Sequence, residues 1–90
     1  MKGAYMELKL FYRTQRDLAL AINKVVDAYW IDEINEQDLL KNIQYLYENN
    51  YFRMLKNGEF PSVLHQQCGK RRLQIVKRIL NANEDFLKKD

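Results

Sequence analysis

The sequence predicts a small all-α domain of four helices, with a C-terminal helix-turn-helix-like hairpin and a short N-terminal extended arm or strand. Apolar residues recur at helical spacing in segments between residues 14 and 82, and capping residues mark where two of these segments begin. The 90 residues suit one domain, and the aromatic residues provide bulk for a core. We therefore expect a single domain over 1–90, with an arm or short strand (1–13), a helical core (14–82) and a frayed tail (83–90).

The N-terminal segment 5–12 shows a period of two. Two sets of side chains alternate along it: Met6, Leu8, Leu10 and Tyr12, and between them Tyr5, Glu7, Lys9 and Phe11. This period predicts a strand, although its outer face is only half polar. Because no second strand is clear, the segment is either an extended arm or a strand that pairs across a homodimer.

The first helix should begin after Thr14, because Asp17 follows three residues later in a pattern that resembles a capping box. Its apolar stripe is formed by Leu18, Ile22, Val25 and Tyr29, with Ala19, Val26 and Trp30 beside it. We expect this stripe to face the core.

The second helix has a clearer start at Asn35, a favourable N-cap residue that acidic residues follow at the positive end of the helix dipole. Ile34 and Leu39 fit a hydrophobic staple around this cap. Leu39, Ile43 and Leu46 form the apolar stripe. The connection from the first helix is about four residues long, so the two helices should be antiparallel neighbours.

The chain should turn after Asn50. Residues 51–56 are interpreted as a short helical turn that ends at Asn57-Gly58, with a β-hairpin around the same dipeptide as the alternative. A short third helix then begins at Pro61 or Ser62 and ends near Cys68. Gly69 provides the turn into a fourth helix that runs to about Ala82.

The fourth helix contains the most informative stretch of the chain, residues 69–80, with five of the fifteen Lys/Arg residues and no acid. Residues 1–60 carry a net charge of −1, whereas residues 61–90 carry +4. At helical spacing one face is apolar (Leu73, Ile75, Val76, Ile79, Leu80) and the other polar (Lys70, Arg71, Gln74, Lys77, Arg78). Arg72 alone falls within the apolar arc. One face can be buried while the other binds an anion.

The third and fourth helices resemble a helix-turn-helix, in which glycine at the ninth place allows a sharp turn before the helix that enters the groove. With Pro61 at place one, Gly69 occupies place nine, and Leu64, Cys68 and Ile75 also match. His65 and Lys70 depart from the usual pattern. Two interpretations remain open: an element that binds DNA or RNA, or a structural hairpin with a solvated basic face.

Other candidate chemistry has simpler explanations. His65 and Cys68 are too few for a zinc site, and Cys68 is expected to be a small buried side chain. Acids between residues 32 and 38 fit helix capping, so no metal, cofactor or catalytic residue is expected. A single cysteine excludes an internal disulfide and fits the cytoplasm, and no apolar run suits a membrane span. Among the aromatics we expect Tyr29, Trp30, Tyr47 and Tyr51 in the core and Tyr45 exposed.

Five stretches together resemble a family of short cytoplasmic proteins of low-GC Gram-positive bacteria: 11–19, 33–40, 47–50, 56–60 and 69–73. The resemblance covers nearly the whole chain, and none of these motifs is catalytic. The family has no assigned function, so the resemblance implies a complete cytoplasmic bacterial protein and no site residues.

Two functions follow from the residues themselves. The first is a non-enzymatic nucleic-acid-binding or transcription-related accessory protein, in which Lys70, Arg71, Lys77 and Arg78 contact phosphates of DNA or RNA and Gln74 contacts a base edge. The alternative is an adaptor whose basic face or aromatic surface binds an acidic protein partner. An enzyme is the least favoured class.

Overall fold

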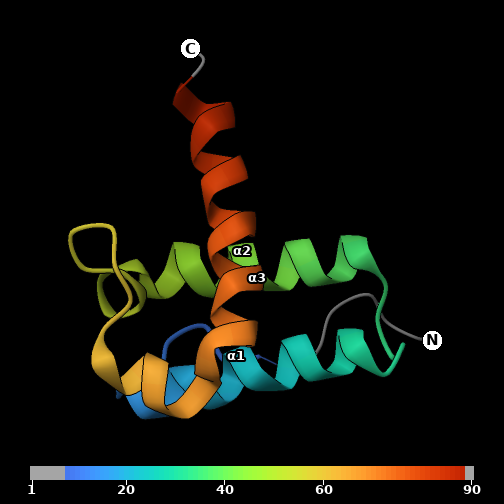
Figure 1. Ribbon diagram of the computed structural model, residues 1–90, viewed down its shortest axis with the longest axis horizontal. Helices are drawn as coiled ribbons and strands as arrows, with labels where there is room; N and C mark the ends of the chain where they lie inside the picture. The colour runs from blue at the N-terminus through green and yellow to red at the C-terminus, as the bar shows by residue number, and fades with distance from the viewer. Residues whose placement is uncertain (1–7, 89–90) are drawn as a thin grey trace.

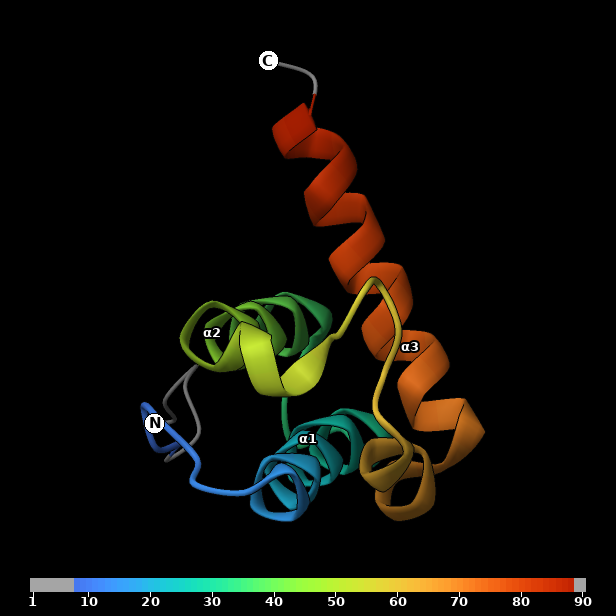
Figure 2. The same ribbon diagram turned by 90° about the vertical axis from the view of Figure 1, so that its left-hand side faces the viewer.

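The computed structural model describes the backbone of residues 8–88 and the side chains of residues 8–82. Three helices account for most of this part of the chain: α1 (Gln15–Trp30), α2 (Glu36–Met54) and α3 (Ser62–Lys88). Helices α1 and α2 run antiparallel in two layers, and α3 crosses both and continues past α2 toward the C-terminus (Figures 1 and 2). The all-α class is therefore confirmed. The two C-terminal helices that the sequence predicts form one helix, α3, which is interrupted at Gly69.

The predicted starts of α1 and α2 are confirmed by their caps. The backbone N–H of Asp17 donates to the Thr14 hydroxyl over 3.0 Å. At α2, the N–H of Asp38 donates to Asn35 Oδ1 over 2.8 Å and the Asp38 carboxylate accepts from the Asn35 N–H, which completes a capping box. These local bonds satisfy N–H groups that the first turn of a helix leaves without partners.

The expected turn after Asn50 is a kink inside α2. Asn50 has non-helical torsions (φ −140°, ψ 26°), and the helix resumes and ends at Met54. After the helix, residues 56–59 adopt the β-hairpin that the sequence offers as the alternative. Lys56 and Glu59 exchange two backbone hydrogen bonds of 2.8 and 3.0 Å. Positive φ at Asn57 (55°) and Gly58 (79°) indicates a two-residue type I′ turn. This turn leads the chain back toward α3.

The strand prediction for 5–12 is wrong over the part that the structure describes, because residues 8–12 adopt no strand; residues 5–7 lie outside the described residues. The backbone of this arm is bonded to a side chain instead. The Tyr12 N–H donates to Asn50 Oδ1, and Asn50 Nδ2 donates to the Leu10 carbonyl. Tyr12 is buried, so the arm docks against the kink in α2.

Nine side chains of the predicted apolar stripes are buried: Leu18, Ile22, Val25, Leu39, Ile43, Leu46, Leu73, Val76 and Leu80. They belong to one cluster to which all three helices contribute. Tyr29 and Ile75, which belong to the same stripes, are half-buried and pack against the core. Two aromatic predictions are wrong, because Trp30 is 45% and Tyr51 59% exposed. Trp30 is the last residue of α1, and Tyr51 follows the kink, where the periodicity of the preceding turns no longer applies. Tyr45, expected outside, is half-buried.

Candidate functional site

The direction of the basic stretch of α3, residues 69–80, is determined at Gly69, where φ is 83° and ψ is 170°. This combination is accessible almost only to glycine. A Cβ at this position would meet nothing within 4 Å, so the backbone torsion, and not space, requires the glycine. The segment before Gly69 lies against α1, where Asn23 Nδ2 donates to the Gln67 carbonyl over 2.9 Å, and the segment after it turns away toward the C-terminus (Figure 2).

The five predicted site residues, which we call the basic face, are all exposed on the second segment of α3: Lys70, Arg71, Gln74, Lys77 and Arg78. The opposite side of the same turns is buried through Leu73, Val76 and Leu80. Within residues 8–82, none of the four cations is paired with a carboxylate. The structure therefore brings the five residues together on one solvent-facing surface whose charge is not neutralised by a described acid.

Arg72, the cation inside the apolar arc, has a different role. Its Nε and Nη2 donate to the two carboxylate oxygens of Asp27 on α1 over 2.9 and 3.1 Å. Nη1 donates to the Cys68 carbonyl over 2.9 Å, and the guanidinium lies 5.6 Å from the centre of the Trp30 ring. Arg72 thus joins α1 to α3 close to the interruption of α3 at Gly69, and it does not belong to the basic face.

His65 and Cys68 do not form a pair. Cys68 is buried and its thiol donates to the Ala19 carbonyl over 3.6 Å, whereas His65 is exposed and contacts the Phe60 ring edge-on. Burial raises the pKa of the Cys68 thiol to about 11, and the Arg72 guanidinium lowers it by less. The thiol is therefore protonated at neutral pH. No cluster of His, Cys, Asp or Glu suited to a metal ion occurs among the described residues.

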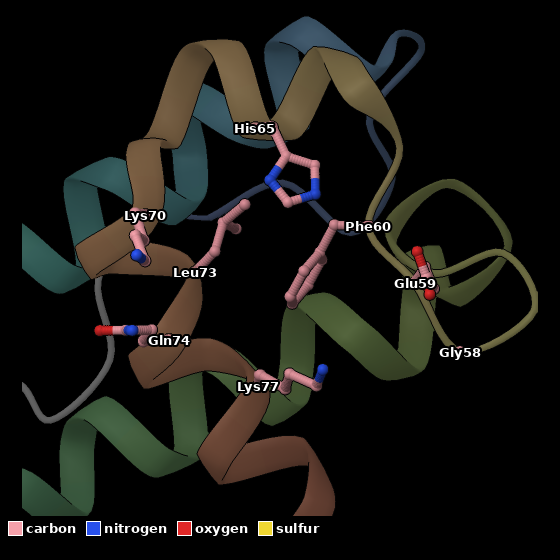
Figure 3. Close-up of a pocket in the computed structure, with 8 residues that line it drawn as sticks. All are labelled: Gly58, Glu59, Phe60, His65, Lys70, Leu73, Gln74 and Lys77. Atoms are coloured by element: carbon pink, nitrogen blue, oxygen red, sulfur yellow. The ribbon is translucent and has the colours of Figure 1, made fainter.

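Among the described residues, three hollows border the basic face. The first, of about 520 Å³, is lined by Gln74, Lys77, Arg78, Asn81 and Ala82. The other two lie on either side of Gln74. One of about 240 Å³ is lined by Phe60, His65 and Leu73 together with Lys70 and Lys77 (Figure 3). The other, of about 340 Å³, lies between α3 and the end of α1 and is lined by Trp30, Arg71, Gln74, Ile75 and Arg78. Sequence analysis missed Phe60 and the exposed Trp30 as members of this surface. The contacts of Trp30 with Arg72 and of Phe60 with His65 place them there.

A second exposed surface, the aromatic cluster, consists of Phe11, Tyr51, Phe52 and Arg53. The Phe11 and Phe52 rings stack with their centres 6.1 Å apart, and Tyr51 meets Phe52 edge-on. The Arg53 guanidinium lies 5.1 and 5.0 Å from the centres of the Phe11 and Phe52 rings. The three aromatic side chains are each about half exposed, so this cluster remains open to solvent.

Fold and site together define a small all-α domain with a basic helix face whose four cations form no ion pair with a carboxylate of residues 8–82. The chain belongs to the CLB_0814 family, described as conserved hypothetical protein, whose family model matches residues 9–81. This match confirms the resemblance to a family without assigned function. Comparisons with curated proteins and with solved structures give no match. None of the helices in residues 8–88 has the length and apolar character needed to cross a bilayer.

Proposed function

We propose that this protein is a non-enzymatic nucleic-acid-binding or transcription-related accessory protein of the cytoplasm, and that the basic face is its contact surface. The observation that supports this most strongly is the absence of any described carboxylate paired with Lys70, Arg71, Lys77 or Arg78. Exposed cations on one helix attract phosphate at long range and release condensed counterions on binding.

The roles within the face follow from chemistry. Lysine and arginine donate to phosphate oxygens and position the protein without reading sequence. Gln74 lies between the cations and carries an amide that pairs with a base edge. We assign phosphate contacts to the four cations and a base contact to Gln74.

The arrangement around Gly69 supports a helix-turn-helix-like hairpin. Leu64 is buried and Ile75 packs against the core, as the motif requires of its fourth and fifteenth places. The two departures from the motif are both exposed side chains, His65 and Lys70, which do not obstruct the packing of one segment on the other. In this proposal the segment that begins at Lys70 is the one presented to nucleic acid.

The test is direct binding of unrelated duplex and single-stranded oligonucleotides at about 50 mM salt, where nonspecific phosphate attraction is strong. We expect measurable affinity that decreases as salt rises. A protein that binds neither kind of oligonucleotide under these conditions is not a nucleic-acid-binding protein.

The aromatic cluster favours a second candidate, an adaptor that binds an acidic protein partner. Phe11, Tyr51 and Phe52 are exposed beside the Arg53 guanidinium, a composition typical of the centres of protein interfaces. A pull-down from bacterial lysate with and without nuclease separates the candidates. A partner that is retained after nuclease treatment and is not displaced by excess DNA supports the adaptor.

A further inference from the structure

The 240 Å³ hollow beside the basic face, which we call the ring pocket, is lined by residues 58–60 and by residues of α3 on both sides of Gly69. Phe60 follows the Asn57-Gly58 turn, and Leu73 is buried in α3. The His65 ring meets the Phe60 ring at 84° with their centres 6.2 Å apart. Figure 3 shows these three side chains around a common space between the hairpin and α3. Its inner walls are thus two rings and an aliphatic side chain.

The opening of the ring pocket is polar, because Lys70, Gln74 and Lys77 follow one another at helical spacing along its α3 side. These three residues also belong to the basic face. Glu59 lines the side of the pocket that is formed by the Asn57-Gly58 turn. The pocket therefore offers apolar ring contacts inside, an amide and a carboxylate for a polar edge, and two ammonium groups for phosphate.

The size of the pocket suits one heterocycle. The volume of about 240 Å³ is several times the roughly 30 Å³ that one water molecule takes up in the liquid. The pocket therefore has room for one base.

We propose that the ring pocket takes up an unpaired base, so that single-stranded nucleic acid is the ligand of the basic face. The base stacks on one of the two rings and meets the other edge-on, because the Phe60 and His65 rings lie at 84° to each other. Its polar edge pairs with Gln74 or with Glu59, and Lys70 and Lys77 hold the adjacent phosphates. A base within a duplex already has its faces stacked and its edge paired, so it would first have to leave the helix. This inference rests on the function proposed above and specifies which nucleic acid the face binds.

The decisive comparison is between two strands with equal charge. A fluorescently labelled single-stranded oligonucleotide and an abasic deoxyribose-phosphate strand of the same length are bound to the full-length protein at about 50 mM salt. Stacking of one base contributes roughly tenfold or more in affinity, so the strand with bases should bind at least about tenfold more tightly than the abasic strand. A duplex of the same length serves as the third probe.

Phe60→Leu keeps an apolar side chain at the partly buried position 60 and removes the ring. It should reduce the affinity for the strand with bases about tenfold and leave abasic binding unchanged. His65→Ala, at an exposed position, tests the second ring without touching the core, and circular dichroism of both variants checks the fold. Val63→Ala, on the same segment but outside the pocket lining, is the control and should bind all probes as the wild type does.

The outcomes separate the two proposals. Equal binding of the abasic strand and the strand with bases, or full binding by both Phe60→Leu and His65→Ala, overturns the ring pocket and leaves the basic face as a phosphate surface. If the wild type binds none of the three probes, the proposed function is overturned as well. Adenosine monophosphate that binds as tightly as the oligonucleotide makes the pocket a mononucleotide site and also overturns the inference.

Discussion

The backbone N–H of Tyr12 donates a 2.9 Å hydrogen bond to Oδ1 of Asn50, which lies 38 residues further along the chain. Nδ2 of the same side chain donates to the carbonyls of Leu10 and Leu46 over 3.3 and 3.0 Å. Asn50 is completely buried at the kink of α2. One carboxamide therefore satisfies backbone groups of the arm and of the kinked helix at once.

Replacement of Asn50 by alanine should destabilise the fold by about 1–3 kcal/mol, because the buried Tyr12 N–H loses its partner. The measurement is the free energy of unfolding in urea. Asn49→Ala is the matched control, since Asn49 Nδ2 bonds only to the Tyr45 carbonyl of its own helix. Equal stability of the two variants would show that the arm is not fixed by Asn50.

The Arg72–Asp27 pair should couple α1 to α3. Arg72→Ala should cost about 1–2 kcal/mol, because it removes both the ion pair and the bond to the Cys68 carbonyl. The side chains are 29% and 47% exposed, so solvent screens the pair, and a double-mutant cycle with Asp27→Ala should give a coupling of about 1 kcal/mol or less. Arg71→Ala, at the adjacent exposed position, should leave stability unchanged. A coupling energy of zero would show that the Arg72–Asp27 pair does not join α1 to α3.

The two glycines with positive φ should differ in their response to asparagine. Gly69→Asn should destabilise the fold by about 1–3 kcal/mol, because ψ of 170° lies outside the left-handed region that asparagine tolerates. Gly58→Asn should cost less, since Asn57 already adopts φ of 55° in the same turn. Thermal unfolding of both variants measures this. Identical midpoints would mean that the torsion at Gly69 is not required.

Cys68 should make stability depend on alkaline pH. The folded-state pKa of about 11 exceeds the ordinary value of 9.0, so folding favours the protonated thiol. This contribution is complete below pH 9 and is lost as pH rises toward 11. Urea unfolding between pH 8 and 11 should therefore show a steeper loss for the wild type than for Cys68→Ala. If the stability of the wild type and of Cys68→Ala falls equally with pH, the burial of Cys68 is contradicted. Rapid alkylation of Cys68 by iodoacetamide at neutral pH would contradict it too.

Reversal of Lys70, Arg71, Lys77 and Arg78 to glutamate should abolish binding to nucleic acid while the fold survives, because all four are exposed. A single reversal should lower the slope of log affinity against log salt by about one. Gln74→Ala should leave that slope alone and change base preference by roughly 1–3 kcal/mol. Reversal of the exposed Lys9, Arg13, Arg16 and Lys24 is the charge-matched control and should have a much smaller effect. If the two fourfold variants bind alike, the basic face is only a solvated surface.

Local signals in the sequence account for the elements that were predicted correctly. Thr14 and Asn35 cap the helices that follow them, and the helical period places the core residues, since both depend on residues within a few positions. The turn position at Gly69 was also predicted, because a glycine between two periodic segments is itself a local signal. The exposed positions of Lys70 to Arg78 follow from the same period.

Features that depend on distant contacts were not predictable. The carboxamide of Asn50 captures the arm, which shows only a strand-like alternation in sequence. The lone cation Arg72 is explained by Asp27, 45 residues earlier. The ring pocket requires Phe60 to be returned to α3 by the Asn57-Gly58 turn. In each case a side chain meets a partner that periodicity does not identify.

The division of the basic stretch between Arg72 and its neighbours has a consequence for natural variation. The one cation that holds the fold is turned toward α1, and the exposed side chains around it contribute nothing to the core. Substitutions at positions 70, 71, 74, 77 and 78 can therefore change the charge of this surface while the core stays the same. A lineage can alter these positions one at a time, and each intermediate keeps the packing of the three helices.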